Sequence, residues 1–382
     1  MRGGVDGIVS KINNLWGVGM KLNNLTYTNA SSNTMNSLSP YVGKIRPDLV
    51  EFLIDEYATS EGGILDPFCG SGSVLLGGWQ KGYSVIGCDL NPYAYVLSMG
   101  KLTPFTSLEI AQEALKHYNL KIADSVNKTC VDDVPAWVRS FFNEDTLKEI
   151  CVWSTILRNN REWFLLSCLM GILHHQRPGF LSYPSSHGAP YLRSKKFPEI
   201  DNPEMYEYRN VYDRLLKKVI RSYKKFPDMD FSLKREVHMK NSSLLNLGGD
   251  KVSTIITSPP YMKSLTYARD NRLRLWFLGT DNWEDLDKII SPAPVNFIKL
   301  MGSSFESWSR IQRRGDKCIA IIGDMSIVYN NIKMSLYEAI RIIAKPYYSM
   351  CEAFEDPIPE SKKVIKGNGR IKREVILVLR RR

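Results

Sequence analysis

Residues 62–92 read GGILDPFCGSGSVLLGGWQKGYSVIGCDLNP, and this stretch decides the fold. Ile64 and Leu65 end a short apolar strand, and a glycine-rich turn follows it directly. The segment 73–81 begins as a helix, and residues 83–88 form a second apolar strand. A strand–helix–strand unit of this kind implies two parallel strands that are joined by a right-handed crossover.

The alternation of strands and helices continues on both sides of this unit. Upstream, residues 41–57 predict a loop and a short helix, because Pro47 suits a first helical position and apolar residues follow at helical spacing. Downstream, residues 331–344 predict a further helix. We therefore predict an α/β fold with a sheet of about seven strands. The five later strands are expected at residues 235–241, 252–257, 317–324, 347–355 and 373–380.

Residues 104–235 interrupt this alternation. They predict helices over 134–157, 161–175 and 204–226, with a long loop rich in proline, serine and glycine at 176–203. We therefore divide the chain into a loosely ordered segment 1–35, a first half of the core 36–103, a mainly helical insertion 104–235 and a second half of the core 236–382.

The charge of the chain favours a polyanionic partner, most simply nucleic acid. The net charge is +11 and the isoelectric point is about 9.2. Residues 193–225 carry ten Lys and Arg against five acidic residues, and residues 362–382 carry nine against one. The helix around Arg209–Lys225 is therefore a candidate for holding phosphates, although an exposed basic face with its apolar side packed inward fits equally well.

The sequence offers little for membrane, disulfide or metal chemistry. No apolar run is long enough to span a bilayer, and the first residues lack the apolar core of a signal peptide, so we expect a cytoplasmic protein. The seven cysteines include no C-x-x-C pair, which argues against disulfides and against a zinc site. His174 and His175, near Cys168, are expected to pack or cap a helix and not to bind a metal.

The turn at residues 66–73, DPFCGSGS, suits a ligand that approaches the backbone closely, because glycines remove side chains and the following helix offers free amides. It is not a P-loop, since no Gly-Lys-Ser/Thr follows, and Leu75 stands where the dinucleotide fingerprint has its third glycine. Asp89 ends the second strand, where a carboxylate can accept hydrogen bonds from two ribose hydroxyls. These features predict a nucleoside ligand without a pyrophosphate, such as S-adenosylmethionine; a plain connection with tightly packed glycines is the alternative.

Residues 257–261, TSPPY, end another apolar strand in a rigid turn. Ser258 and the backbone carbonyl of Pro259 would face a crevice at the carboxyl end of the sheet. Two acceptors held stiffly there would help to localise the lone pair of an exocyclic amino group, which otherwise attacks a methyl group poorly. The two prolines supply the stiffness, and Tyr261 offers a flat face for a flipped-out base. A chance S-P-P-Y loop is the alternative.

Together these motifs resemble the amino-group DNA methyltransferases, most closely the T-S-P-P-Y group that methylates N4 of cytosine. DPFCGSG looks like the cofactor motif of that family, GCDLNP like its ribose-binding motif and TSPPY like its catalytic motif, while YVGKIRPDLVEFLI is similar to a further cofactor-binding segment. The resemblance covers residues 40–100 and 236–382 and implies a Rossmann-like, S-adenosylmethionine-dependent methyltransferase sheet with a mainly helical insertion. By this resemblance the base pocket consists of Ser258, Pro259, Pro260 and Tyr261, and the cofactor is held by Asp66, Pro67, Phe68, Gly70, Gly72, Asp89 and, in place of the usual acidic residue near the adenine, Asn241.

The resemblance predicts a site-specific enzyme that flips a cytosine out of duplex DNA and methylates its N4 directly, in a restriction–modification setting. A cytosine-C5 enzyme is disfavoured because no Pro-Cys occurs. Adenine N6 is the closest rival acceptor, although Asp is commoner than Ser before Pro-Pro-Tyr in that group. A catalytically inactive DNA-binding module on the same scaffold is the second alternative. The insertion is the candidate target-recognition region, a restriction endonuclease for the same site is a candidate partner, and the sequence specifies no oligomeric state.

Overall fold

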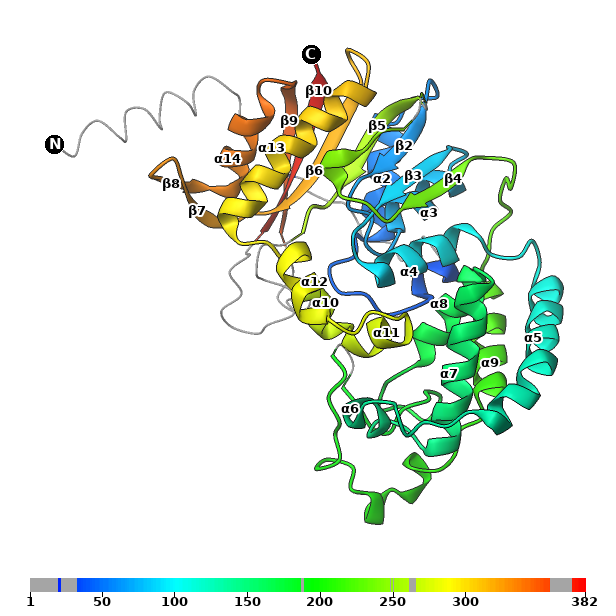
Figure 1. Ribbon diagram of the computed structural model, residues 1–382. Coiled ribbons are helices and arrows are strands. Elements are labelled where there is room, and N and C mark those ends of the chain that lie inside the picture. The colour runs from blue at the N-terminus through cyan, green and yellow to red at the C-terminus, as the bar shows by residue number, and fades with distance from the viewer. Residues whose placement is uncertain are drawn as a thin grey trace.

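The structure of the protein, a computed structural model, describes residues 20–21, 33–186, 189–247, 249, 251–260, 266–357 and 373–382. Its centre is an eight-stranded sheet that contains all seven expected strands and, at one edge, a further strand of two residues (Figure 1). In spatial order the strands are β1 (Met20–Lys21), β9 (Tyr348–Pro357), β10 (Arg373–Arg381), β6 (Lys317–Gly323), β5 (Val252–Thr257), β2 (Gly63–Asp66), β3 (Val85–Cys88) and β4 (Arg235–His238).

The predicted motifs follow the carboxyl ends of parallel strands, and these ends all lie on the same side of the sheet. Strand β2 is parallel to both β3 and β5, and β4 and β6 continue the sheet outward in the same direction. Strand β10 lies between β6 and β9 and is antiparallel to both. The chain thus extends the sheet from β2 to one side and then from β5 to the other. Ligands of open α/β sheets bind at such a reversal, beyond the carboxyl ends of the strands.

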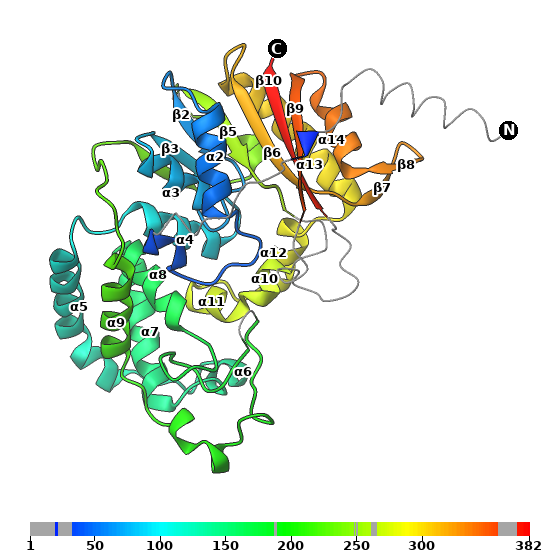
Figure 2. The same cartoon turned by 180° about the vertical axis from the view of Figure 1, so that it is seen from behind.

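Helices cover both faces of the sheet, because successive residues of a buried strand point to opposite sides. Ile64 of β2 belongs to one apolar core, and its neighbour Leu65 belongs to the other. Figure 2 shows the helix that precedes β2 on the near face of the sheet. The covering helices are α2 (Pro47–Tyr57), α3 (Ser73–Gln80) and α4 (Pro92–Leu102) on one face, and α13 (Pro294–Ile311) and α14 (Leu336–Ala344) on the other.

A second group of helices, at the lower end of Figure 1, comprises α5 (Leu108–Lys128), α6 (Ala136–Arg139), α7 (Glu144–Asn159), α8 (Trp163–Ile172) and α9 (Val211–Tyr223). Helix α8 is buried along its whole length except at its first residue, and it packs against α4, α7 and α9. Its contact with α4 is close, since the Ser167 hydroxyl donates to the Val96 carbonyl at 2.8 Å. The insertion is therefore mainly helical, as predicted, and α8 joins it to the core.

The helix expected over residues 331–344 is shorter than predicted. Strands β7 (Ser326–Tyr329) and β8 (Ile332–Ser335) form an antiparallel hairpin, and α14 begins only after β8. Asn330 and Asn331 turn this hairpin with φ angles of +49° and +62°. Asparagine tolerates this left-handed conformation, and two-residue hairpin turns require it. The Asn-Asn pair was the sequence signal for the hairpin, and the apolar residues of β8 concealed it by continuing the helical spacing.

Other helix boundaries in the insertion also differ from the prediction. The helix expected over 134–157 is divided into α6 and α7, because the Asn143 side chain caps α7 by accepting from the Asp145 amide at 3.0 Å. The helix expected over 204–226 is limited to α9, which Asn210 caps in the same way. Helix α5 was not predicted. Only four of its residues are buried, so its apolar stripe is narrow, and the apolar Ile110 and Leu120 lie among the polar residues of its exposed face.

The basic helix predicted to hold phosphates directs part of its charge inward. Arg209 is only 4% exposed, and three backbone carbonyls accept from its guanidinium. Lys218 is 6% exposed and donates to the Ser37 carbonyl at 2.8 Å. Arg209 joins segments inside the insertion, and Lys218 joins the insertion to the segment at Ser37. The assignment of the whole helix to phosphate binding is therefore wrong for these two cations. The cations left at the surface here are Lys217, Arg221, Lys224 and Lys225.

The described ranges contain neither a helix long and apolar enough to cross a bilayer nor a group of three or more potential metal ligands. His174 and His175 are both buried just after α8. The segment 1–35, expected to be loosely ordered, lies outside the described residues except for Met20, Lys21 and residues 33–35.

Candidate functional site

A pocket lies beyond the carboxyl ends of β2, β3 and β5, where the strand order reverses. The glycine turn after β2, the end of β3, the segment after β4 and the proline turn after β5 all contribute to its lining. Gly72 and Pro259 do not line it, and Tyr261 lies outside the described residues. The predicted site residues that line the pocket are Asp66, Pro67, Phe68, Gly70, Asp89, Asn241, Ser258 and Pro260.

Asp89 fixes the glycine turn to the end of β3. Its Oδ2 accepts from the Gly70 amide at 2.8 Å, and its Oδ1 accepts from the Asn91 amide at 2.9 Å. Withdrawal from water raises the pKa of Asp89 to about 6, although the amides of Asn91, Gly70 and Leu90 act in the opposite direction. A carboxylate has about four lone-pair positions, so Asp89 retains acceptor capacity for a ligand in the pocket.

The glycine turn depends on a left-handed residue packed against α4. Gly72 has a φ of +69°, and a Cβ atom there would lie 2.7 Å from Ser98 Oγ and 3.0 Å from Ser98 Cα. The same serine hydroxyl donates to the Gly70 carbonyl at 3.0 Å. Gly72 therefore shapes the turn from the side that faces α4, without lining the pocket.

We expect Gly72→Ala to lower the free energy of unfolding by about 3 kcal/mol, the sum of left-handed strain and overpacking against Ser98. Gly82→Ala is the matched control, because Gly82 has a φ of +84° but no atom of the described residues within 4 Å of its added Cβ. The control should lose only the strain, about 1 kcal/mol. Urea denaturation measures both values, and equal losses in the two variants would contradict the packing argument.

Asp66 joins the glycine turn to the proline turn. Its Oδ1 accepts from the Thr257 hydroxyl at 2.7 Å and from the Phe68 amide at 3.2 Å. Thr257 is the last residue of β5, directly before Ser258. Asp66 is 1% exposed, and this burial raises its pKa to about 7 despite the two hydrogen bonds and with a further rise from the charge of Asp89. The two predicted motifs are thus linked by one buried carboxyl group.

The raised pKa of Asp66 predicts a pH-dependent stability. The folded protein retains the proton up to about pH 7, whereas the unfolded chain releases it near pH 4, so the free energy of unfolding falls as the pH rises between these values. Asp66→Asn stays neutral and keeps an acceptor oxygen. The free energy of unfolding of Asp66→Asn minus that of the original protein should therefore increase by on the order of 2 kcal/mol between about pH 5 and about pH 8.

Urea denaturation at the two pH values tests this expectation. Asp55→Asn serves as the control, because Asp55 is an exposed residue paired with Lys81 at 2.8 Å and should show no comparable gain. A stability difference for Asp66→Asn that does not change with pH would show that Asp66 is ionised throughout the range.

Asn241 presents an amide, and not a carboxylate, to the pocket. Its Oδ1 caps the short helix η4 (Ser242–Leu244) by accepting from the Ser243 amide at 3.0 Å and from the Ser243 hydroxyl at 2.9 Å. The oxygen is therefore engaged within the chain, and the amide nitrogen is the atom suited to contact a ligand.

Two tyrosines in the pocket wall were not predicted individually. The ring of Tyr41 lies 6.3 Å from that of Tyr267 in a stacked arrangement, and its Cε1 atom lies 3.2 Å from the position of a Cβ at Gly70. Tyr41 belongs to the segment that resembles a cofactor-binding motif, whereas Tyr267 begins the short helix α10 (Tyr267–Asp270) after the proline turn. The sequence carried no spacing signal that could pair these two rings.

The geometry of the pocket agrees with what comparison with known proteins shows. Residues 47–129 match a family model described as D12 class N6 adenine-specific DNA methyltransferase. The chain is thus similar to DNA methyltransferases. The matched range includes α2, the glycine turn and Asp89, which is the cofactor side of the pocket, and it ends well before the proline turn.

Two curated relatives are Type II methyltransferases. M.BsoBI of Geobacillus stearothermophilus is 25% identical over 269 residues, which cover 61% of this chain and 50% of the relative. M.MjaII of Methanocaldococcus jannaschii is 30% identical over 95 residues, which cover 25% of this chain and 16% of the relative. The chain therefore spans half the length of the first relative and less of the second.

Among solved structures, the rRNA methyltransferase aviRa from Streptomyces viridochromogenes is 12% identical, with a TM-score of 0.35 over 93% of this chain and 94% of that one. The fold itself is read from the strand order. The order in which the chain adds parallel strands reverses between β2 and β5, and the antiparallel strand β10 lies between β6 and β9. This arrangement is that of a Rossmann-like methyltransferase sheet. The predicted fold class is confirmed.

Proposed function

We propose that the protein is a DNA methyltransferase that transfers the methyl group of S-adenosylmethionine to an exocyclic amino group, with N4 of cytosine as the acceptor. The observation that carries this proposal is that the glycine turn and the proline turn line one pocket and are joined by the 2.7 Å hydrogen bond between Thr257 and Asp66. A nucleoside cofactor and a base can therefore occupy adjoining positions at the edge of the sheet.

The glycine-turn side of the pocket fits S-adenosylmethionine, which supplies an electrophilic methyl group when bound. Asp89 would accept from the ribose hydroxyls with its remaining lone pairs. The amide nitrogen of Asn241 would donate to the adenine ring, and Gly70 would let the ligand approach the backbone. The proposed cofactor residues are completed by Asp66, Pro67 and Phe68 in the lining and by Gly72 behind the turn.

The proline-turn side would hold the base. The Ser258 hydroxyl, which lines the pocket, would accept from one hydrogen of the amino group, which concentrates its lone pair on nitrogen. The Pro259 carbonyl is the proposed acceptor for the second hydrogen, although Pro259 itself is buried and does not line the pocket. Pro259 and Pro260 fix the local φ angles, so these acceptors need little reorganisation when the base arrives. Stacking of the base on Tyr261 remains a prediction, since that residue lies outside the described part of the chain.

Cytosine N4 and adenine N6 are both supported by a specific observation. The description of the matched family names adenine N6. That match ends at residue 129, however, and the groups that would contact the base lie at residues 258–261. Ser258 in place of an aspartate favours cytosine, so we retain N4 of cytosine as the first candidate and adenine N6 as the second.

Mass spectrometry of nucleosides decides between these acceptors. Plasmid DNA incubated with the purified protein and S-adenosylmethionine is digested to nucleosides, and N4-methylcytosine is expected above the level of a reaction without protein. N6-methyladenine alone would replace the first candidate by the second. The absence of both products, with the cofactor bound, would favour an inactive DNA-binding module.

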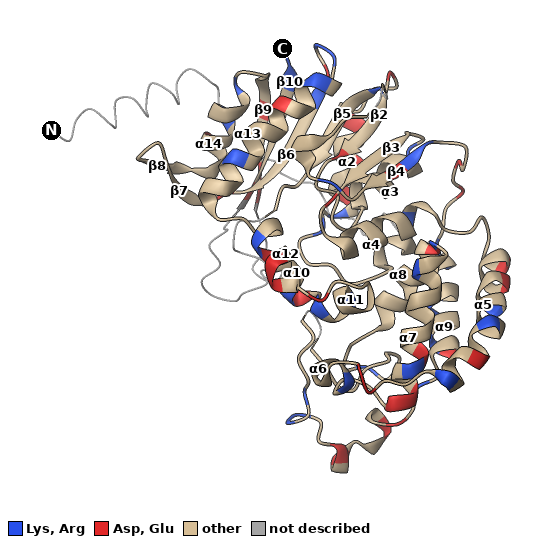
Figure 3. Cartoon of the chain, in the orientation of Figure 1, with Lys and Arg blue, Asp and Glu red and all other residues tan. Residues whose placement is uncertain are grey.

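Duplex DNA as substrate agrees with the excess of basic residues. Figure 3 shows basic residues both on the elements of the sheet and on the helical insertion, and basic and acidic residues alternate on α5 and on α12 (Trp283–Ile290). Recognition of one DNA site by the insertion, and a restriction endonuclease for the same site as a partner, belong to this proposal. Mapping of the modified bases in treated plasmid DNA tests the site specificity.

A further inference from the structure

Two short segments of the insertion, residues 184–186 and 189–193, pair with each other beside the segment that follows the proline turn. The Ser186 amide donates to the Tyr191 carbonyl at 2.8 Å, and the Arg193 amide donates to the Pro184 carbonyl at 2.7 Å. Ser185 and Leu192 form an antiparallel bridge between these two hydrogen bonds. These two paired segments, called the 184–193 hairpin below, lie between α8 and α9 in the sequence, and residues 187 and 188 between them lie outside the described part of the chain.

The base of the 184–193 hairpin is anchored in the interior. Ser185 is fully buried, and its hydroxyl lies 3.4 Å from Nδ1 of the buried His174, just beyond the end of α8. On the other arm, the Arg193 guanidinium donates to the Gln176 side chain. Because both arms are held by buried or partly buried groups, the orientation of the exposed residues is fixed by the body of the insertion.

The exposed edge of the hairpin carries a large aromatic ring with a cation on its face. Tyr191 is 52% exposed and Leu192 is 38% exposed. The Arg272 guanidinium carbon lies 4.8 Å from the centre of the Tyr191 ring, and Nη2 of Arg272 donates to the Pro190 carbonyl at 2.7 Å. A ring held in one orientation binds a partner at a lower entropic cost than a freely rotating ring.

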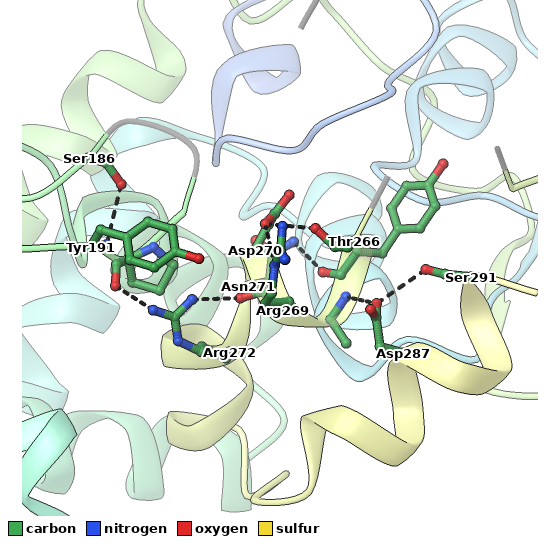
Figure 4. A network of polar contacts seen from close by, with 12 residues as sticks. Ser186, Tyr191, Thr266, Arg269, Asp270, Asn271, Arg272, Asp287 and Ser291 are labelled. Atoms are coloured by element: carbon green, nitrogen blue, oxygen red, sulfur yellow. Dashed lines mark hydrogen bonds and ion pairs between the residues drawn. The ribbon is translucent and has the colours of Figure 1, made fainter. Parts of the chain in front are cut away.

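Arg272 also connects the hairpin to the segment that follows the proline turn. It begins the helix α11 (Arg272–Phe277), and its Nη1 donates to the Arg269 carbonyl at 3.0 Å. Asp270 in turn accepts from the Thr266 hydroxyl at 3.0 Å, and Thr266 is where the described chain resumes after the proline turn. Figure 4 shows these labelled residues in one network, with Tyr191 at one end and Thr266 toward the other. The hairpin is thus coupled to the segment that follows the T-S-P-P-Y motif.

We propose that the 184–193 hairpin contacts duplex DNA beside the methylated base. Tyr191 would pack against a base, and the neighbouring cations would contact the phosphates of the DNA backbone. This inference rests on the proposed function. Flipping a base exposes the faces of its neighbours in the stack, and an aromatic ring can cover one of them. The residues next to the hairpin have the charge that phosphates require, since Lys195 and Lys196 are exposed and Arg193 is partly exposed.

Replacement of Tyr191 tests the proposal. Stacking of a base on an aromatic side chain contributes about 1–3 kcal/mol, so Tyr191→Ala should raise the KM for plasmid DNA roughly 10- to 100-fold. The dissociation constant for S-adenosylmethionine should not change. Tyr191→Phe keeps the ring and should retain nearly the original KM, which separates stacking from the loss of a hydroxyl group.

Tyr208→Ala is the matched control, because Tyr208 is a tyrosine of the same insertion with 47% exposure, and its hydroxyl donates to Glu149 away from the hairpin. Its KM for DNA should stay within about twofold of the original value, the effect of an ordinary surface substitution. Thermal unfolding of each variant identifies any general loss of structure. An unchanged KM in Tyr191→Ala, or an equal rise in Tyr208→Ala, would overturn the assignment.

Binding of DNA without catalysis separates this inference from the proposed function. Fluorescence anisotropy measures binding of the original protein and the variants to fluorescein-labelled random-sequence duplexes. Tyr191-dependent binding without methyl transfer would sustain the contact between the hairpin and DNA and would refute the proposed function. Methyl transfer with binding and KM unaffected by Tyr191→Ala would refute only the hairpin assignment. No binding by the original protein would refute both.

Discussion

Ser258→Ala is expected to reduce the rate of methyl transfer about 100-fold while leaving the affinity for S-adenosylmethionine unchanged. Removal of one rigidly placed hydrogen-bonding group from a transition state typically costs on the order of 100- to 1,000-fold in rate. Ser258 lines the pocket directly after Thr257, whose hydroxyl is committed to Asp66 at 2.7 Å. The threonine therefore cannot take over the function of the missing serine hydroxyl.

Single-turnover transfer of a radiolabelled methyl group to plasmid DNA measures the rate, and calorimetry measures the affinity for the cofactor. Ser253→Ala is the matched control, because Ser253 lies at the opposite end of the same strand and donates to the Thr59 carbonyl at 3.2 Å. It should retain the original rate. Full activity of Ser258→Ala, or loss of cofactor binding in it, would contradict the proposed division of the pocket.

Asp89→Ala should raise the dissociation constant for S-adenosylmethionine about 100-fold. Hydrogen bonds to a charged group contribute about 1.5–3 kcal/mol each, and the variant loses those to the ligand together with the anchor of the glycine turn. The dissociation constant of Asp89→Asn should lie between those of the original protein and Asp89→Ala, because asparagine keeps one acceptor oxygen without the charge. Calorimetric titration provides the values, and Asp55→Ala, which removes an exposed carboxylate far from the pocket lining, is the control.

The affinity should also depend on pH through the same residue. The pKa of Asp89 is raised to about 6, so the carboxyl group gains a proton as the pH falls through that value and loses acceptor capacity for the ribose. Titrations at pH values on either side of 6 should show weaker binding on the acidic side. In Asp89→Asn this dependence should be reduced, and an identical pH profile in the two proteins would assign the effect to another group.

The strands and the two turns could be predicted because their signals are local. Residues 62–92 contain a complete strand–turn–helix–strand unit, and the apolar run at 252–257 ends in residues that cannot continue a strand. Parallel strands then place both turns at the same edge of the sheet. The topology alone is enough to bring Gly70 and Ser258 together, and both residues line one pocket in the structure.

The remaining features depend on contacts between distant segments, which carry no local signal. Tyr41 and Tyr267 meet across the pocket, and Tyr191 meets Arg272, only because the chain folds as it does. The basic excess of the insertion also gave a wrong prediction for some of its residues. Arg209 counts toward the basic excess of the insertion, yet backbone carbonyls surround its guanidinium in the interior. A sequence gives the sign of such a charge but not its exposure.

The position of β10 has a consequence for how the chain acquires its structure. Strands β6 and β9 precede β10 in the sequence, but they lie on either side of it in the sheet. During synthesis one edge of each of these two strands stays unpaired until residues 373–381 leave the ribosome and pair with both strands. Exposed edges are templates for association with other chains. We therefore expect this half of the protein to be the part most dependent on chaperones while it is being translated.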